Sequence, residues 1–464
     1  MAGSGYPRGM AQHPPATGRS PAQVPIPRQP LHGWGRYPVI EARYRRGEDL
    51  ERLTRNAQLS RGLGRAYGDA ALPPQGSGRL VAGTTRADRI LGFDPDSGIL
   101  SAEAGFSLAE LGRLFLPRGW FTPVSPGTRY VTLGGMVASD IHGKNHHVKG
   151  TFGNYVRRLR MRLGSGKVLD VTPESHPDLF WATCGGQGLT GHVLEVDVQL
   201  EKLPSPWLYE ETQRYGNLQA VFDALTEESA RWPMTVAWID TSAPGDALGR
   251  GIVMAGRWAT PDEAPKEPPT DNPALTVPPI FPSGVMNPMT VRAMNALWYA
   301  KHPRSRVKHV VKPASFYWIL DLAREWNRGY GKRGFTQFQC VMPSSVELYR
   351  EFLARFRALG GCSFITVFKD CGPMGKGHLS FPQRGTSLAL DIPIFPGVER
   401  LARELNAFVI ANGGRIYLSK DAFTTEAEFR AMYPRFEEFQ EVRRRYDPEL
   451  RIQSALSRRL MGDG

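Results

Sequence analysis

The chain has 464 residues, which is too long for one compact core and predicts two domains, or one domain with a large insertion. Its composition, 41% hydrophobic and 22% charged residues, is that of an ordinary globular protein. The net charge of +13 favours anionic partners such as nucleotides, lipid phosphates, an anionic membrane surface or nucleic acid. A solvated basic surface explains the charge equally well.

The four cysteines exclude two further classes of protein. They include no CxxC pair and no Cys/His cluster at the spacing of metal ligands, so a zinc site is not expected. Their small number also argues against a disulfide framework. We therefore expect buried, reduced thiols at Cys184, Cys340, Cys362 and Cys371.

Residues 1–33 are predicted to form a disordered, basic, proline-rich arm. The first 40 residues contain no acidic residue and eight prolines, and their sequence offers no apolar run for the core of a signal peptide. Nowhere does the sequence reach the ~18 apolar residues of a membrane-spanning helix. We expect a protein that is cytoplasmic or peripheral at the inner membrane, with its first folded element near Trp34.

Residues 34–203 are predicted to form one domain of mixed α/β structure. Ser107 and Glu110 have capping-box spacing ahead of an amphipathic run, which predicts a short helix. An alternating run, a glycine turn and a second apolar run over residues 159–171 predict a hairpin. A further strict alternation over residues 194–200 predicts a half-buried strand that ends at a domain boundary.

Residues 204–410 are predicted to form a second domain that covers the first as a cap, and residues 411–464 to return to the first domain. Nine prolines between Pro261 and Pro288 predict an irregular loop at 259–292. Loops of this length commonly act as lids or binding loops, or are disordered.

Helical and strand patterns alternate in the second half of the chain. Ser344 and Glu347 predict the start of a helix that stops at Gly360. A similar apolar pattern from Leu401 to Phe408 predicts another helix. Strands are expected at residues 335–342, 364–368 and 388–394.

Three glycine-rich segments of the first domain can carry ligand chemistry: residues 60–69, 126–147 and 180–191. Glycine allows backbone N–H groups to approach a pyrophosphate closely and permits positive φ. The first segment matches neither the Rossmann fingerprint nor the Walker A motif, so a different nucleotide-binding fold is implied. Each segment alone could be a structural turn.

The second segment also carries His142, His146 and His147, together with Lys144. His142 and Lys144 add proton-transfer and charge functions to the segment. The three histidines have no accompanying carboxylate or cysteine cluster, so we do not expect a metal site.

The order of the three segments resembles the FAD-binding domain of the vanillyl-alcohol oxidase superfamily, also called the PCMH-type domain. The ending, with residues 432–436 and Asp447-Pro448, is similar to that of the aldonolactone-oxidase branch. Motifs at 141–147, 325–328, 380–382 and 417–421 resemble oxidases of that branch that act on a polyprenylphosphoryl pentose. The resemblance implies an α+β fold, with a two-subdomain FAD domain and an α+β cap domain that contains an antiparallel sheet.

The same resemblance implies a function. It is that of an FAD-dependent oxidoreductase that oxidises the 2′-hydroxyl of a polyprenylphosphoryl-β-D-ribose to the 2′-keto form. This is the first half of an epimerisation to the arabinose donor of cell-envelope glycans, which an NAD(P)H-dependent short-chain reductase would complete. The implied substrate is a polyprenyl-phosphate sugar, with peripheral membrane contact and without nucleic acid as a partner.

Two alternatives remain open from the sequence. One is a soluble aldonolactone or sugar-alcohol oxidase similar to D-arabinono-1,4-lactone oxidase, with the same cofactor and a different substrate. The other is a basic RNA-binding protein without catalysis, in which the glycine segments are only turns.

The resemblance also assigns residues. Positions matching the family's FAD contacts are Arg61, Gly62, Leu63, Gly64, Arg65, Pro126, Gly127, Thr128, Thr132, Gly134, Gly135, Ala138, Ser139, Ile141, Gln187, Gly188, Val193 and Tyr417. Positions matching its substrate pocket are Tyr67, Lys144, Tyr317, Gln337, Gln339, Lys369, Ser387 and Ala389. Tyr317 and Gln339 could instead be packing residues of the cap.

Chemistry at the reacting centre is assigned to Lys420 first and to His142 second. Removing a hydride and a proton from a carbinol needs an acceptor and a base within hydrogen-bond reach. Lys420 matches a family lysine beside the flavin, and its role is divided between electrostatics and base catalysis. The FAD is expected to be non-covalent, because Arg65 stands where covalent members attach flavin through histidine.

The chain departs from the family pattern at Ala389 and Ser387. The most similar relatives commonly carry Cys and Asn at these positions. A thiol is not needed for hydride transfer, so we expect oxidase activity without it.

Overall fold

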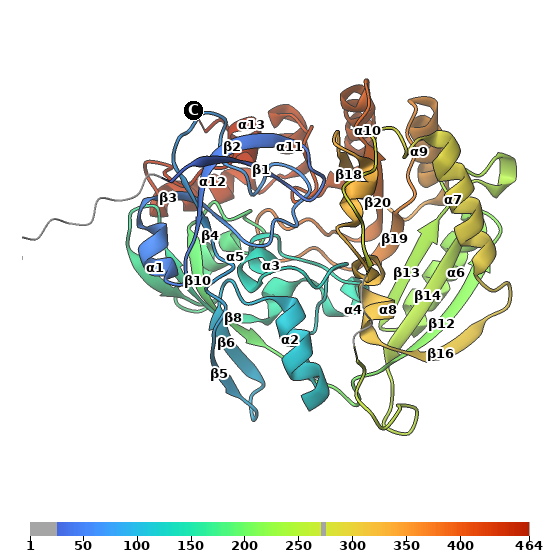
Figure 1. The fold of residues 1–464 in the computed structure, drawn as a ribbon, viewed down its shortest axis with the longest axis horizontal. Helices are drawn as coiled ribbons and strands as arrows, with labels where there is room; N and C mark the ends of the chain where they lie inside the picture. Colours follow the sequence, from blue (N-terminus) through green and yellow to red (C-terminus); the bar gives the residue numbers. More distant parts are fainter. Residues whose placement is uncertain (1–25, 271–274, 464) are drawn as a thin grey trace, which may run out of the picture.

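The computed structural model describes residues 26–270 and 275–463, which form two halves side by side (Figure 1). The strands of the first half are β1 (Arg28–His32), β2 (Val39–Arg46), β3 (Ala57–Arg61), β4 (Leu80–Gly83), β5 (Ile90–Asp94), β6 (Ile99–Glu103), β7 (Trp120–Phe121), β8 (Val156–Arg162), β9 (Val168–Val171), β10 (His192–Gln199) and β11 (Glu201–Lys202). Those that follow are β12 (Leu208–Tyr215), β13 (Met234–Ile239), β14 (Gly251–Trp258), β15 (Leu275–Thr276), β16 (Val307–Val311), β17 (Ala323–Arg324), β18 (Phe335–Met342), β19 (Thr366–Cys371), β20 (Gly385–Pro393) and β21 (Arg415–Ile416).

The helices are distributed over both halves. They are α1 (Leu50–Leu53), α2 (Leu108–Phe115), α3 (Leu133–Ala138), α4 (His146–Lys149), α5 (Pro177–Thr183), α6 (Leu218–Arg231), α7 (Pro288–Lys301), α8 (Pro313–Tyr317), α9 (Val346–Ala358), α10 (Val398–Ala411), α11 (Glu426–Met432), α12 (Phe436–Tyr446) and α13 (Ala455–Met461). None of the helices in the described ranges is long and apolar enough to cross a membrane.

The first half contains two larger sheets and the second half one large sheet, and the pairs β11-β7 and β15-β17 form two further two-stranded sheets. The strand orders are β1-β2-β4-β3 and β5-β6-β10-β8-β9 in the first half, and β16-β12-β14-β13-β19-β20-β18-β21 in the second. The pairs of the large sheet are antiparallel. The fold is therefore α+β, as the resemblance implies.

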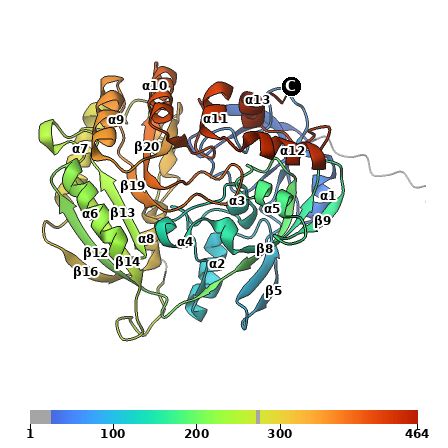
Figure 2. The same cartoon turned by 180° about the vertical axis from the view of Figure 1, so that it is seen from behind.

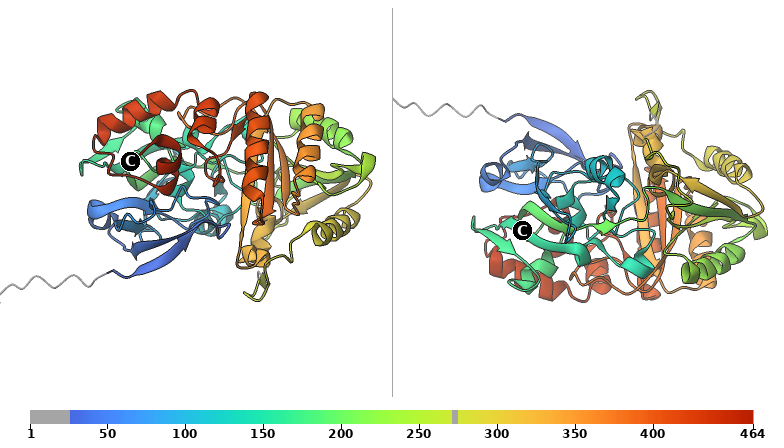
Figure 3. Two further views of the ribbon diagram at one scale, coloured as in Figure 1. Left: turned by 90° about the horizontal axis from the view of Figure 1, so that it is seen from above. Right: turned by 90° about the horizontal axis from the view of Figure 1, so that it is seen from below.

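The large sheet is buried on both faces at its centre. Every residue of β18 is buried, as are all but the last of β20. Helices α6, α9 and α10 pack on one face (Figure 3), and the other face turns toward the first half. Strands buried on both sides become rich in apolar residues, with polar residues retained where a ligand or partner needs them.

The carboxyl-terminal segment crosses from the second half to the first. After α10, strand β21 pairs with β18, and helices α11, α12 and α13 then lie over the first half (Figure 2). The expected boundary near residue 203 falls between β11 and β12, where the chain leaves the first half.

Several elements expected from the sequence are confirmed. Ser107 caps α2 by accepting from the Glu110 N–H, strands β8 and β9 form the hairpin, and β10 and α10 lie where the patterns place them. Strand β18 has the expected bounds of 335–342. All four cysteines are free and buried.

Other expectations need correction. The folded chain begins before residue 33, because β1 pairs with β2 through backbone hydrogen bonds that composition does not reveal; the rest of the expected arm, residues 1–25, lies outside the described residues. Ser345, not Ser344, caps α9 by accepting from the Leu348 N–H. Strand β19 starts two residues later than expected and β20 three residues earlier. The proline-rich loop contains the short strand β15 and ends where α7 begins.

Candidate active site

A cavity of about 280 Å³ lies where the glycine-rich segments meet the large sheet. Its walls combine the first half of the molecule, the strands β18, β19 and β20, and the segment after β21. The residues of both halves that line it include Trp34, Gly62, Leu63, Gly64, Arg65, Tyr67, Pro126, Gly127, Thr128, Thr132, Gly134, Gly135, Ala138, Ser139, Ile141, His142, Gln187, Gly188, Val193, Leu320, Trp326, Gln337, Gln339, Lys369, Ala389, Tyr417, Ser419 and Lys420.

The first and third glycine-rich segments contribute backbone to the cavity in conformations that glycine favours. Gly64 and Gly188 have φ of 68° and 74°, and Gln187, which precedes Gly188, has φ of 54°. A side chain on Gly64 or Gly188 would be strained in this left-handed region. The glycines there are therefore required by the loop shapes.

The groups that line the cavity suit FAD. A Cβ atom added at Gly127 or Gly188 would meet no atom within 4 Å, so both backbones face open space along the lining. Arg65 supplies a cation to the same wall, where its guanidinium lies 3.7 Å from the centre of the Trp34 ring. Exposed backbone amides and an arginine are the groups that a pyrophosphate needs.

The large sheet supplies polar side chains to the opposite wall. Gln339 lies opposite Ala389 in the β18–β20 register, and Gln337 lies opposite Asp391. Lys369 extends from the neighbouring strand β19. Because residues two apart share a face of a strand, the polar residues form one patch toward the cavity.

Lys420 follows β21 and lies at the centre of this arrangement. Its ammonium is 3.8 Å from the centre of the Tyr67 ring. Burial lowers the pKa of Lys420 to about 7, and the Asp391 carboxylate opposes this shift. Burial raises the pKa of Asp391 to about 7, and the hydrogen bond from Gln337 and the charge of Lys420 oppose that shift. Burial thus favours the neutral form of each group, and the opposite charge of its partner favours the charged form.

His142 is buried beside the sheet. The Gln339 Nε2 amide lies 3.0 Å from His142 Nε2 and donates to it, so the ring proton is placed on Nδ1. Burial holds the pKa of His142 well below its usual range, which keeps the ring neutral. The Nδ1 atom has no hydrogen-bond partner among the described residues.

Four residues assigned by resemblance do not line the cavity. The Arg61 guanidinium donates to His32 O at 2.6 Å and supports the first glycine segment from behind. Lys144 donates to Phe316 O, and Tyr317 contacts a methionine sulfur through its hydroxyl. Ser387 accepts from Gln339 Nε2 at 3.2 Å, one layer away from the cavity. Arg61 is adjacent in sequence to Gly62, and Ser387 contacts Gln339, and both of these partners line the cavity.

The sequence analysis did not assign Asp391, Trp34 or Trp326 to the site, although Trp326 lies within the motif at 325–328. Asp391 follows Ala389 by two residues on the same strand face, and a carboxylate in an otherwise buried strand was a usable signal. The ring centres of Trp34 and Trp326 lie 5.7 Å apart, although the two residues are 292 positions apart in the sequence. Their pairing depends on the tertiary fold and left no local pattern.

The described residues contain no group of three or more His, Cys, Asp or Glu side chains that could hold a metal ion. The three histidines of the second segment are instead separated by their partners. His146 Nδ1 accepts from the Gly372 N–H at 3.0 Å, and His147 Nε2 contacts Trp232 O at 2.9 Å.

Comparison with known proteins agrees with this site. An FAD-binding domain family matches residues 54–172. Decaprenylphosphoryl-β-D-ribose oxidase from Mycolicibacterium smegmatis is 38% identical over 460 residues, covering 95% of this chain and 99% of that protein. An uncharacterized protein from Streptomyces coelicolor is 34% identical over 76% of this chain and 99% of its own length. A putative D-arabinono-1,4-lactone oxidase from Neurospora crassa is 27% identical over 24% of this chain and 19% of its own length.

The cavity and the matched domain define an FAD-dependent oxidoreductase with a PCMH-type FAD-binding domain. This excludes the alternative of an RNA-binding protein without catalysis. The M. smegmatis oxidase is 38% identical and is matched over 99% of its length. The chain therefore belongs to the decaprenylphosphoryl-β-D-ribose oxidase family.

Proposed function

We propose that the protein oxidises the 2′-hydroxyl of a polyprenylphosphoryl-β-D-ribose to the 2′-keto form. The observation that carries this proposal is the polar wall of the cavity, which sets Lys369 and Lys420 beside the amides of Gln337 and Gln339. Lysines suit a phosphodiester as point charges, and amides suit sugar hydroxyls as donors and acceptors. The similarity to the M. smegmatis oxidase supports the choice of sugar.

Product analysis tests this assignment. The purified enzyme is given a polyprenylphosphoryl-β-D-ribose, and the product is reduced with borodeuteride. We expect one deuterium at C2 of the resulting ribose and arabinose, because only a 2′-ketone accepts it there. Deuterium at another carbon, or its incorporation only from a free lactone, would support the alternative of an aldonolactone or sugar-alcohol oxidase.

Different residues of the chain have different roles in the proposed reaction. Bound FAD supplies the acceptor for the hydride that leaves the carbinol carbon. Lys420 takes part both as a charge beside the reacting centre and as a group that can hold or accept the hydroxyl proton. His142 is the second proton-transfer group, and Gln337, Gln339 and Lys369 orient the sugar and its phosphate.

The FAD is proposed to bind without a covalent link. The Arg65 guanidinium is occupied by the Trp34 ring and by Tyr130 O at 3.2 Å, and it offers no nucleophile for attachment to a flavin. We therefore expect acid precipitation to release all yellow colour into the supernatant. Flavin absorbance that stays with the washed, denatured pellet would contradict this prediction.

Asp391→Asn is expected to move the pH dependence of flavin reduction. The carboxylate raises the pKa of Lys420 against the effect of burial, so its removal lowers that pKa further. The protonated fraction of Lys420 then falls at neutral pH, and the limb of the pH–rate profile that Lys420 sets moves to lower pH. Single-turnover rates across pH values around neutrality measure this shift.

Asp240→Asn is the matched control, because Asp240 is also a buried carboxylate but belongs to the cap, where it pairs with Arg250 at 3.0 Å. This variant should lower stability and leave the pH limb in place. An unmoved limb in Asp391→Asn, or equal shifts in both variants, would exclude Asp391 as the charge partner of Lys420.

Ala389 predicts how the enzyme responds to electrophiles that are activated at the flavin and captured by a thiol. Ala389 lines the cavity from β20, and none of the four free cysteines lies on that strand. Such compounds should therefore inhibit the protein reversibly, and Ala389→Cys should make it susceptible to irreversible capture. Intact-mass analysis after turnover tests this, and a stable adduct on the unaltered sequence would refute it.

Two partners are proposed with the substrate. A 2′-keto sugar needs reduction from the other face to complete an epimerisation, so we propose an NAD(P)H-dependent short-chain reductase as the second enzyme. A polyprenyl tail lies in a membrane, so we also propose peripheral contact with an anionic membrane surface, which the net charge of +13 favours.

A further inference from the structure

The segment that carries Lys420, residues 417–421, is fastened to the second and third glycine-rich segments. We call it the lysine segment. The Tyr417 hydroxyl donates to Ser139 O at 2.8 Å, and Ser419 Oγ donates to Gln187 Oε1 at 3.0 Å. The position of Lys420 is therefore set relative to the loops that line the cofactor cavity.

Besides the contact of Lys420 with the Tyr67 ring, the lysine segment meets the first glycine-rich segment through backbone atoms. The Tyr67 N–H donates to Ser419 O at 2.9 Å. A Cβ atom on Gly68 would lie 1.6 Å from Asp421 O, so two stretches of main chain touch without a side chain between them. Packing this close leaves no room for a side chain, so a shift of either stretch is felt by the other.

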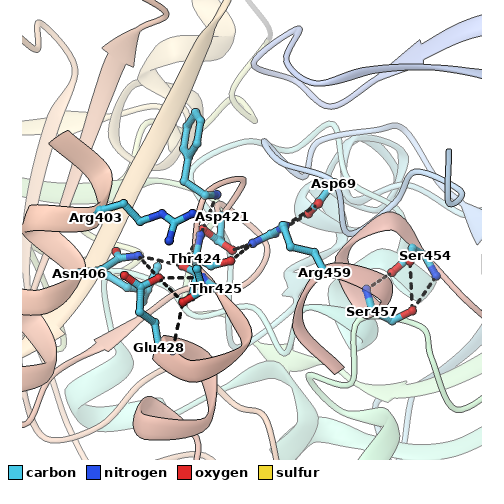
Figure 4. Close-up of polar contacts among 12 residues, drawn as sticks. Asp69, Arg403, Asn406, Asp421, Thr424, Thr425, Glu428, Ser454, Ser457 and Arg459 are labelled. Carbon is cyan, nitrogen blue, oxygen red and sulfur yellow. Dashed lines mark hydrogen bonds and ion pairs between the residues drawn. The ribbon is translucent and has the colours of Figure 1, made fainter. Parts of the chain in front are cut away.

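Arg459, on the last helix α13, holds both stretches (Figure 4). Its Nε and Nη2 atoms donate to the two oxygens of Asp69 at 2.9 and 2.8 Å. Its Nη1 atom donates to Asp421 Oδ2 at 2.8 Å and to Thr424 O. Asp69 follows Gly68 in the first segment, and Asp421 follows Lys420. The Arg459 guanidinium thus joins Asp69 of the first glycine-rich segment to Asp421 of the lysine segment, close to the place where the two backbones touch.

Both carboxylates are buried, with 5% of Asp69 and 6% of Asp421 exposed. Burial alone would raise the pKa of Asp421, but the Arg459 charge and the N–H groups of Thr424 and Phe423 hold it below its usual range. Two buried anions near each other repel unless a cation lies between them. The planar fork of arginine can serve both at once, whereas a lysine ammonium is a single point charge.

We propose that Arg459 is a positioning residue for Lys420, which it keeps in fixed register with the first glycine-rich segment and so with the FAD. The proposal rests on the proposed role of Lys420. Arg459 itself touches neither the cavity lining nor the reacting groups. Its effect passes through Asp421 and Asp69 to the lysine segment.

Arg459→Lys is the deciding variant, and Arg306→Lys is its matched control. Arg306 also joins two buried carboxylates, Glu211 at 3.1 Å and Glu228 at 2.5 Å, but it does so in the cap, away from the cavity. Both variants keep the positive charge and should lower the thermal midpoint. Only Arg459→Lys should lower the rate constant of flavin reduction at saturating substrate, by about 10²-fold, the loss typical of a misplaced catalytic group, with little change in KM.

Amide hydrogen exchange of the FAD-loaded protein gives a readout that does not depend on activity. Arg459→Lys should speed exchange in peptides that cover residues 66–72 and 417–425, whereas Arg306→Lys should leave these peptides as in the unaltered protein. Arg459→Gln, which leaves two buried carboxylates without a cation, should show the same exchange pattern with a larger loss of stability.

Equal reduction rates in Arg459→Lys and Arg306→Lys, or unaltered exchange over residues 417–425 in Arg459→Lys, would overturn the proposal. Its failure is distinct from failure of the proposed function. If none of the sugar substrates reduces the flavin, the proposed function fails. Amide hydrogen exchange then still decides whether Arg459 holds the lysine segment. If Lys420→Ala loses reduction while Arg459→Lys does not, the function of Lys420 stands and the positioning role falls.

Discussion

Lys420→Ala is expected to abolish reduction of the bound FAD by the sugar substrate while the fold and the FAD content are retained. Lys420 borders the cavity with its ammonium 3.8 Å from the centre of the Tyr67 ring. The ammonium forms no salt bridge within 4 Å to a described residue, and its loss raises the pKa of the buried Asp391 carboxyl further rather than breaking an ion pair. The lysine segment keeps the hydrogen bond that the Tyr67 N–H donates to Ser419 O and the one that the Tyr417 hydroxyl donates to Ser139 O.

Stopped-flow reduction under anaerobic conditions measures this loss. His142→Ala serves for comparison, because His142 borders the same cavity and has neither the charge nor the central position of Lys420. The His142→Ala substitution should lower the rate of flavin reduction by roughly 10²–10⁴-fold, as is typical of a lost acid–base group. A Lys420→Ala enzyme that reduces its flavin at a near-normal rate would remove Lys420 from the reacting centre.

Gly68→Ala is expected to destabilise the protein strongly and to release its FAD. The added Cβ would lie 1.6 Å from Asp421 O, which is a backbone atom and cannot turn aside as a flexible side chain can. The first glycine-rich segment and the lysine segment must then separate. Overpacking typically costs about 1–3 kcal/mol, and we expect this substitution to reach or exceed the upper end because backbone meets backbone.

Gly92→Ala is the control for Gly68→Ala. Gly92 lies on β5, where an added Cβ meets no atom within 4 Å. Thermal unfolding and the ratio of flavin to protein absorbance should distinguish the two variants, with Gly92→Ala close to the unaltered protein. A Gly68→Ala protein that keeps both its FAD and its stability would show that the close approach of the two segments is not needed.

Local sequence patterns were enough to predict those elements whose signals lie within a few residues of one another. Ser107 and the apolar run behind it predict α2, and the glycines of the three segments predict loops that a nucleotide can approach. The cofactor and the fold class came from the resemblance of these segments to a family. The error at Ser344 arose because Ser345, the actual cap of α9, is its neighbour and has the same side chain.

The rest of the site depends on contacts between distant parts of the chain. Arg459 meets Asp69 across 390 residues, and Gln339 meets His142 across 197. No local pattern marks such pairs, because each residue alone reads as a surface charge or a polar strand residue. Strand β1 escaped prediction for a related reason: its proline and arginine content suggests an arm, and its structure comes from pairing with β2.

The central claim is that this chain holds FAD and reduces it with a polyprenylphosphoryl pentose. The most direct measurement is anaerobic bleaching of the flavin absorbance after addition of polyprenylphosphoryl-β-D-ribose, with free D-ribose and D-arabinono-1,4-lactone tested in parallel. We predict rapid and complete bleaching by the prenyl-phosphate sugar, and slow bleaching or none by the other two. A colourless protein, or faster bleaching by the lactone than by the prenyl-phosphate sugar, would contradict the account.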